Sequence, residues 1–304
     1  MSKQEHDAAA ARLRAGVSSF DKPWYRSSSE LLSRTGIRGK KCLDLCCGNG
    51  EFSRILKERH AMDVTCADYI PFHTQHAQEQ GFPVIPVDID TSAQQVDAAA
   101  EPYAGKFDLV VNLAAIEHVF NSDNLLRFAH TVLKPGGFLL VNTPNIDFLA
   151  YRMYALLAGN RPFGEGHHIR FWDFRFLRTN LFLNGFTVTN DARSFYALPQ
   201  DAMLRAFKNR KRIASMVAWL FHSCQILQHI PLLRGMCSDE LTVLAVKDEV
   251  PAVGFELNRV QHFLKEHTGS EKGKEAGKRL LAAREKGWLD EHLYLAKLVD
   301  SLAP

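Results

Sequence analysis

The sequence predicts an α/β protein built on a doubly wound, mostly parallel sheet. From residue 41 onward, short β-rich apolar segments alternate with helical segments, which is the pattern of βαβ units. Several of these β-rich segments end at an acidic or polar residue, as strands do where a crevice opens at one edge of such a sheet. With 304 residues, of which 46% are hydrophobic and 23% charged, the chain is long enough to bury a full core.

Seven segments have the composition of strands, and helices are expected between them. The predicted strands cover residues 41–46, 63–67, 84–87, 107–112, 138–142, 186–189 and 241–246. The predicted helices cover residues 50–60, the segment after Pro71, and residues 92–100, 121–133, 147–158 and 173–184. The helix over 121–133 is expected to end at Lys134-Pro135-Gly136-Gly137, a proline-glycine stop signal.

Three regions are predicted around this alternating core. Residues 1–35 are expected to form an N-terminal helical arm, which either packs against the main domain or covers the cofactor as a lid. The main domain is placed at 36–250 and carries a mainly helical insertion at 195–238. Residues 251–304 are expected to be a helical appendage with a break near 268–270, either solvated or part of a homo-oligomer contact.

Composition argues against several classes of function and site. A net charge of +3 does not indicate nucleic-acid binding, and no Asn-Pro-Pro-aromatic motif follows the fourth strand. The six cysteines lack the density of a disulfide scaffold and the paired spacing of a zinc site. Four of them fall in predicted strands or the glycine turn, which favours reduced thiols in a cytoplasmic protein.

No segment has the length and apolarity of a membrane span. The N-terminal residues lack the apolar core of a signal peptide. Residues 213–230 contain no Lys, Arg, Asp or Glu, but they include Ser, His and Gln side chains that are costly in hydrocarbon. We therefore expect a cytoplasmic protein with, at most, a surface contact to the inner membrane.

The glycine turn after the first strand is the strongest local signal. Residues 41–50 read Lys-Cys-Leu-Asp-Leu-Cys-Cys-Gly-Asn-Gly, and a helix begins directly afterwards. Gly48 and Gly50 permit a tight strand-to-helix turn and a close approach of backbone to a ligand. Nucleotide-like cofactors bind at this first turn of a doubly wound sheet.

Polar residues at successive strand ends indicate which part of a cofactor binds there. They are Asp44, Asp68, Asp88 and Asn112. Asp68 follows Asp44 at close to the roughly 20-residue spacing expected of a ribose-binding acid. A carboxylate can accept hydrogen bonds from both hydroxyls of a ribose.

The glycine pattern distinguishes between adenosine-containing cofactors. A nicotinamide-dependent oxidoreductase would carry a third glycine inside the helix, where this chain has Ser53. An acid also stands before the glycines, so the turn favours a cofactor that contains adenosine but no phosphates. The oxidoreductase remains the less favoured alternative.

Taken together, these motifs resemble those of class I S-adenosylmethionine-dependent methyltransferases. The resemblance covers about residues 35–190 and the last strand near 240–247. It is carried by Leu43-Asp44-Leu45-Cys46-Cys47-Gly48-Asn49-Gly50, Asp68, Asp88-Ile89, Phe107–Asn112, Ile116-Glu117-His118-Val119, Leu133-Lys134-Pro135-Gly136-Gly137 and Asn142-Thr143-Pro144-Asn145. It implies a Rossmann-like sheet of seven strands with an antiparallel last strand, and S-adenosylmethionine as the cofactor.

The resemblance also implies positions for cofactor contacts. They are Asp44, Cys46, Gly48, Asn49, Gly50, Asp68, Tyr69, Ile70, Asp88, Ile89, Asn112 and Leu113. Asp44 would lie near the methionine amino group, Asp68 would hold the ribose hydroxyls, and Asp88 would meet the adenine amino group. Tyr69 or Ile70 would lie against adenine with Ile89 beside the ring, and Asn112 and Leu113 would border the sulfonium.

One residue departs from the family pattern. The family usually has glycine at the position of Cys46. A positive φ would strain a cysteine there by about 1–3 kcal/mol. We therefore expect an ordinary φ at Cys46 and retained cofactor binding.

Methyl transfer to an alcohol or phenol requires removal of a proton, for which histidine is suited near neutral pH. The candidates are His118, His167 and His168. His118 is either such a base or a structural residue after the fourth strand. Ile116-Glu117-His118-Val119 also resembles quinone-pathway O-methyltransferases, some of which use a metal-binding acid three residues before the glutamate. Ala114 occupies that place, so no metal is expected.

The predicted insertion at 195–238 gives information about the class of acceptor. Basic residues precede Trp and Phe within 205–221, which fits either a helical cap over the acceptor pocket or a peripheral contact with an anionic membrane. Its location resembles that in methyltransferases of bacterial surface-polysaccharide pathways. We expect methyl transfer to a small-molecule or saccharide acceptor, most simply at oxygen, in polysaccharide or natural-product biosynthesis. A non-catalytic binding scaffold is the alternative.

Overall fold

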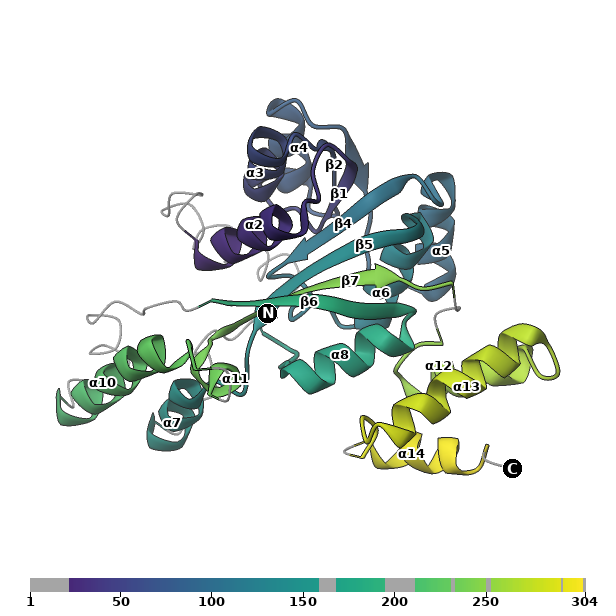
Figure 1. Ribbon diagram of the computed structural model, residues 1–304. Helices are drawn as coiled ribbons and strands as arrows, with labels where there is room; N and C mark the ends of the chain where they lie inside the picture. The colour runs from purple at the N-terminus through teal and green to yellow at the C-terminus, as the bar shows by residue number, and fades with distance from the viewer. Residues whose placement is uncertain are drawn as a thin grey trace.

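The computed structural model describes residues 22–158, 168–194, 211–230, 233–249, 253–290 and 292–302. Seven strands form one sheet in the order β3-β2-β1-β4-β5-β7-β6 (Figure 1). They are β1 (Lys41–Leu45), β2 (Asp63–Asp68), β3 (Val84–Pro86), β4 (Phe107–Leu113), β5 (Leu133–Pro144), β6 (Phe186–Ser194) and β7 (Glu240–Lys247). The first five strands pair in parallel, and β7 is antiparallel to both β5 and β6. The predicted fold class is confirmed.

Helices cover both faces of the sheet. One face is covered by α2 (Pro23–Thr35), α3 (Glu51–His60) and α4 (Pro71–Glu79). The other is covered by α5 (Ala93–Ala100), which continues into a short 3₁₀ turn (Glu101–Tyr103), and by α6 (Ser122–Val132) and α8 (Phe174–Leu183). The central strand β4 shows why both layers form. Its side chains alternate between the two faces, so Leu109 and Val111 pack in one core and Val110 packs in the other, and all three are fully buried.

Local sequence sets several helix starts. Ser92 accepts a hydrogen bond from the backbone N–H of Gln95, and the Gln95 side chain completes a capping box at the start of α5. Asn121 accepts from the backbone N–H of Asn124 in the same way at α6. Pro71 occupies the first turn of α4, where its missing N–H leaves no helical hydrogen bond unmade.

Strand β5 begins earlier than the sequence predicts. Helix α6 ends before Lys134, as expected, but the chain enters the sheet at Leu133 rather than at Phe138. Leu133 pairs with Phe107, and an irregularity separates this pair from that of Leu109 with Phe138. A Cβ at Gly137 would lie 2.9 Å from the Lys134 carbonyl oxygen, so this bulged stretch requires glycine.

Two further groups of helices stand outside the sheet layers. Helices α7 (Leu149–Ala158), α10 (Lys211–Leu227) and α11 (Arg234–Cys237) share a small apolar core of their own. At the other end of the molecule, α12 (Leu257–Glu266), α13 (Glu271–Glu285) and α14 (Leu293–Asp300) pack around a core that includes Leu183 of α8 (Figure 1). Within the described parts of the chain, no helix is both long and apolar enough to cross a bilayer.

A buried carboxylate attaches the C-terminal helices to the sheet domain. Asp123 at the start of α6 is fully buried and accepts hydrogen bonds from the backbone N–H groups of Phe255 and Glu256. Its other oxygen accepts from Nδ2 of Asn184 at 2.8 Å. Arg279 of α13 adds an ion pair with Asp248, at 2.6 Å. These contacts hold the linker and α13 against the domain.

Candidate functional site

The strand registers bring the predicted polar residues to one edge of the sheet. Asp44 pairs with Cys66 on one side and with Val111 on the other, so Asp68 and Asn112 each lie just beyond those partners. Asp68 pairs with Pro86, which places Asp88 two residues past the same edge. Because β1 to β4 are parallel, this edge is the carboxyl edge, where ligands bind in open α/β sheets.

The glycine turn is held in place by backbone hydrogen bonds. Cys46 N–H and Cys47 N–H both donate to the Ala67 carbonyl oxygen, at 2.7 and 3.1 Å. Gly48 and Gly50 have φ values of 54° and 71°, which glycine adopts at no steric cost. Gly50 is also the N-cap of α3.

The expectation of an ordinary φ at Cys46 is wrong. Its φ is 61°, one of three positive values at non-glycine residues in the described chain, the others being at Ala61 and Ala114. The turn imposes this left-handed conformation, because the N–H groups of Cys46 and Cys47 both donate to the same Ala67 carbonyl oxygen. Burial and the nearby Asp68 raise the pKa of the Cys46 thiol, which therefore stays neutral.

Asp68 connects β2 to the glycine turn. Its Oδ2 accepts from the Gly48 N–H and its Oδ1 from the Ile70 N–H, both at 3.0 Å. The residue is 6% exposed, and burial raises the pKa of its carboxyl group against the opposing effect of these backbone donors. Each oxygen keeps a further lone pair for a ligand hydroxyl.

Asp44 lies buried under the turn. The Ser53 hydroxyl donates to its Oδ2 at 2.5 Å, which gives the residue in place of the third glycine a structural role. Burial raises the pKa of Asp44 to about 7, with the Ser53 hydrogen bond opposing and Asp68 reinforcing the shift.

This raised pKa predicts how stability depends on pH in the protein without cofactor. Between about pH 4 and pH 7 the folded protein keeps the Asp44 proton that the unfolded chain loses, so this contribution to stability falls as pH rises. Asp44→Asn should remove this loss, which is on the order of 2–4 kcal/mol. Urea unfolding of both proteins at pH 5 and pH 7.5 measures it, and equal pH dependence in the two would contradict the assignment.

Asn49 faces helix α4. Its Oδ1 lies 2.6 Å from Nδ1 of His73, and its carbonyl oxygen accepts from Nε2 of Gln80 at 2.7 Å. Both contacts fix the turn between the two glycines against α4. His73 and Gln80 were not predicted as part of the site, since nothing in the sequence indicates that α4 packs beside the turn.

The remaining predicted cofactor residues differ in exposure. Tyr69 is 36% exposed, Asp88 is exposed, and Ile70 and Leu113 are half-buried. Ile89 is only 3% exposed and packs within the sheet core. Nδ2 of Asn112 donates to the Leu45 carbonyl oxygen at 2.9 Å, which fixes the orientation of a fully buried amide.

Two candidate histidines lie together beyond the end of β4. The ring centroids of His118 and His168 are 4.7 Å apart. The backbone N–H groups of Ile169 and Arg170 donate to the Glu117 carbonyl oxygen, so the segment after His168 is fixed to the segment that carries His118. His167 lies outside the described residues.

Glu117 completes this cluster, and the predicted site omitted it. Its carboxylate is 2% exposed, accepts from the Thr143 hydroxyl at 3.0 Å, and has Oε1 3.8 Å from Nε2 of His118. Its place beside His118 in the motif was a signal that could have identified it. Thr143 comes from β5 and could be found only through the pairing of β4 with β5.

The cluster also has the composition of a metal site. One ligand atom from each of Glu117, His118 and His168 lies within 4.8 Å of the others. Imidazole and carboxylate are ligands for zinc and other transition metals. Ala114 supplies no ligand, as predicted from the sequence, but His168 brings a third one from a distant segment. That no metal is required stays a prediction.

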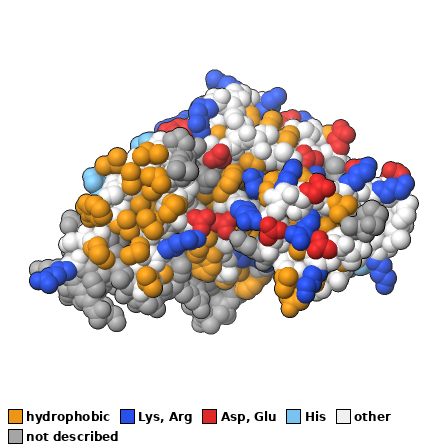
Figure 2. Space-filling view, turned by 60° about the horizontal axis from the view of Figure 1, so that its bottom comes forward, with side chains coloured by type: hydrophobic (Ala, Val, Ile, Leu, Met, Phe, Trp, Pro, Cys, Tyr) orange, Lys and Arg blue, Asp and Glu red, His pale blue; other side chains and the backbone are white. Residues whose placement is uncertain are grey.

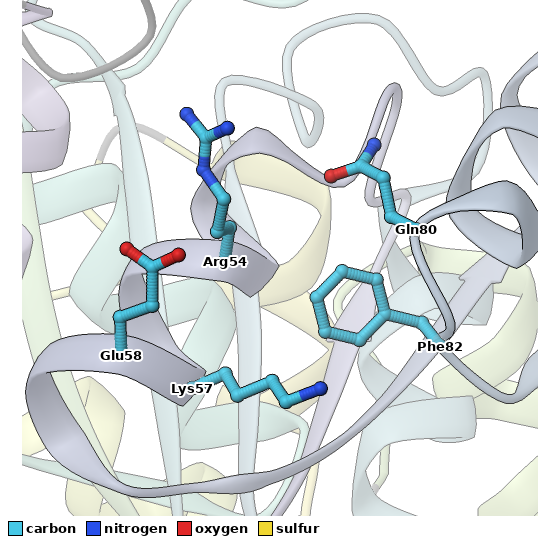
Figure 3. Close-up of a pocket in the computed structure, with 5 residues that line it drawn as sticks. All are labelled: Arg54, Lys57, Glu58, Gln80 and Phe82. Carbon is cyan, nitrogen blue, oxygen red and sulfur yellow. The ribbon is translucent and has the colours of Figure 1, made fainter.

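A cavity in the described part of the chain shares Gln80 with this arrangement. It has a volume of about 280 Å³ and is lined by Arg54, Lys57, Glu58, Gln80 and Phe82 (Figure 3). Its charged walls come from α3, and the Lys57 ammonium lies 5.4 Å from the Phe82 ring centroid. None of the predicted site residues lines it.

Comparisons with known proteins agree with this fold. Residues 24–190 match a family described as a methyltransferase domain. The ubiquinone biosynthesis O-methyltransferase of Pseudomonas aeruginosa is 34% identical over 129 residues, which are 41% of this chain and 53% of that protein. The protein of the same name from Photorhabdus laumondii is 33% identical over 133 residues, 42% and 53% of the two chains. The chain thus matches about half the length of these curated relatives.

A solved structure shows the same fold. It is a chain from the complex of the Haloferax volcanii Trm112 methyltransferase activator with a methyltransferase, and it has a TM-score of 0.53 and 16% identity. The alignment covers 81% of this chain and 98% of that one. With its family match over more than half of its length, the chain belongs to the class I S-adenosylmethionine-dependent methyltransferases.

Proposed function

We propose that this enzyme transfers the methyl group of S-adenosylmethionine to an oxygen atom of a small hydroxylated acceptor. The observation that carries the proposal is the Glu117–His118–His168 cluster, which places imidazole groups beside a buried carboxylate beyond the end of β4. An acid–base group of this kind suits an acceptor that must lose a proton.

The residues at the carboxyl edge fit the cofactor. Asp68 offers carboxylate lone pairs for a ribose diol, and Gly48 and Gly50 leave room beside the backbone. Oδ1 of Asn112 is buried and has no hydrogen-bond partner among the described residues, which supports a ligand group near the end of β4. Asp44 is the proposed neighbour of the amino group, a cation that would stabilise its ionised form.

The chain's own residues then have distinct tasks. The bound cofactor supplies a methyl group on a sulfonium, and most of the rate enhancement comes from in-line alignment in a closed site. Asn112 and Leu113 border the reacting centre in this proposal. Nε2 or Nδ1 of His118 or His168 accepts the proton of the acceptor hydroxyl, and the Glu117 carboxylate stabilises the imidazolium that forms.

The acceptor class is the less constrained part of the proposal. The curated relatives are named as O-methyltransferases of ubiquinone biosynthesis, which supports oxygen as the attacked atom. A phenol or a saccharide offers such a hydroxyl, and we retain a saccharide of surface-polysaccharide or natural-product biosynthesis as the proposed substrate. We place the reaction in the cytoplasm, with peripheral contact at the inner membrane surface through residues 205–221.

Incubation of the purified chain with methyl-labelled S-adenosylmethionine and fractionated cell extract tests the proposal. The expected result is a small organic product that carries the labelled methyl group on oxygen. Like the methyl group of an ether, this label should not be released by mild base. Cofactor binding by calorimetry without any labelled product across all fractions would instead favour a binding scaffold. Label at nitrogen or carbon would overturn the choice of oxygen.

A further inference from the structure

Helix α10 has an apolar stripe on its outward side. Its inward residues Phe221 and Cys224 are buried against α7 and α11, with the Phe221 ring centroid 5.1 Å from that of Phe148. Met216, Trp219 and Ile226 are nevertheless 46%, 70% and 62% exposed. Their spacing of three and seven residues places them on one face, roughly opposite Phe221. Both sides of the helix thus carry large apolar side chains, interleaved on the outward side with the exposed Ser215 and His222, and the described residues cover only the inward side.

The neighbouring elements extend this apolar surface. Leu156 of α7 and Met236 of α11 are 76% and 48% exposed, and Ile230 just beyond α10 is 46% exposed. Six of the 13 well-exposed large hydrophobic side chains in the described chain lie in this small part of it. Figure 2 shows hydrophobic side chains gathered over this end of the molecule, while charges of both signs intermingle at the opposite end. We call these six residues the α10 surface.

The charge of the surrounding sequence has one sign. Residues 202–238 contain six Lys or Arg residues and no Asp or Glu, although the whole chain carries 34 acidic residues. Five of the six basic residues fall within 205–212, directly before and at the start of α10. Arg212 is exposed and lies on the same side of the helix as Met216 and Trp219, one turn earlier. An apolar stripe with a basic end suits an anionic membrane surface.

The helices that carry the α10 surface are connected to the edge of the sheet that holds the candidate site. Asn145, directly after β5, donates from Nδ2 to the carbonyl oxygens of Gly235 and Ser238, both at 2.7 Å. The end of β5 pairs with the start of β7, Pro144 with Glu240. Since β4 and β5 are parallel, these helices leave the sheet on the side where β4 ends near His118.

We propose that the α10 surface docks the enzyme on an anionic lipid bilayer. The apolar side chains enter the boundary between headgroups and acyl chains, and Arg212 at the basic start of α10 contacts anionic headgroups. A second copy of the chain fits less well, because residues 202–238 contain no Asp or Glu and a contact between two copies of this surface would leave the basic residues without acidic partners. The carboxyl edge then lies near the lipid–water interface. An enzyme held in this position would reach acceptors at the interface. We therefore infer, resting on the proposed function, that the acceptor is an amphiphilic, lipid-linked hydroxyl compound.

Vesicle binding tests docking without any methyl transfer, so failure of the proposed function would not affect the result. The full chain is sedimented with vesicles of phosphatidylcholine alone or mixed with phosphatidylglycerol. We expect binding to the mixed vesicles that weakens with added salt, and a loss of about tenfold or more in Trp219→Ser/Ile226→Ser. Both residues are exposed, so the double variant should keep the wild-type melting temperature and cofactor affinity.

The matched control is Leu293→Ser/Tyr294→Ser, which removes two side chains of α14 that are 58% and 75% exposed. It should bind vesicles as the wild type does. Absence of vesicle binding by the wild type, or an equal loss in both double variants, would overturn the proposal. So would self-association of the wild type that Trp219→Ser/Ile226→Ser abolishes without any change in vesicle binding.

Discussion

S-adenosylmethionine should bind the Asp68→Ala variant about 5- to 150-fold more weakly than the wild type, a loss of about 1–3 kcal/mol. The carboxylate is buried, and each oxygen is oriented by one backbone N–H, from Gly48 or Ile70. Alanine would remove both proposed acceptors for the ribose hydroxyls and leave the Gly48 N–H without its partner. Calorimetry with the cofactor and with its demethylated product measures the effect, which should be similar for both because they share the ribose.

Asp63→Ala is the matched control for this substitution. Asp63 begins the same strand that Asp68 ends, and it is exposed at the opposite edge of the sheet. Its loss should leave cofactor affinity unchanged. If Asp68→Ala folds normally and still binds the cofactor with wild-type affinity, Asp68 has no role in holding the ribose.

His118→Ala should lower turnover by about 100-fold or more while cofactor affinity stays near that of the wild type. The histidine lies outside the glycine turn and belongs to the Glu117–His118–His168 cluster, which we propose takes the proton of the acceptor. His168→Ala tests the second ring in the same way, and only the true base should show the full loss. Single-turnover methyl transfer together with cofactor calorimetry separates the two quantities.

His262→Ala is the control, since this histidine is exposed on α12 in the C-terminal helices. A base and a metal ligand give different results in one further measurement. If the histidine acts as a base, prolonged treatment with chelator leaves wild-type turnover unchanged. Turnover that chelation abolishes and one divalent cation restores would show that the cluster binds a metal, contrary to the prediction from Ala114. Full turnover in both histidine variants would remove the proposed base.

The strand ends were predictable because the position of each strand along the chain depends on local composition. Apolar β-rich runs ending at Asp68 or Asn112 are recognisable without any long-range information, and parallel pairing then brings the ends to one edge. The start of β5 was missed because Pro135 and Gly136 signal a turn. Tertiary pairing with β4 nevertheless extends the sheet through them.

The parts of the site that escaped prediction depend on contacts between distant segments. Nothing local to Glu117 indicates that Thr143 donates to it or that His168 lies against His118. Cys46 was missed for a different reason. Its identity favours an ordinary φ, but the hydrogen bonds of two successive N–H groups to Ala67 impose the left-handed conformation. A strained residue at a binding turn indicates that the surrounding structure, and not the residue itself, determines the backbone there.

The pairing of β6 with β7 has a consequence for how this enzyme could change its substrate. The chain leaves the sheet after Ser194 and returns at Glu240, and these two residues are themselves paired. The segment between them therefore begins and ends at neighbouring points of the sheet, and outside the sheet its helices α10 and α11 pack against α7. A chimaeric enzyme that exchanges this segment together with α7 would keep the strands that carry Asp44, Asp68 and Asn112, so new acceptors could be acquired without rebuilding the proposed cofactor site.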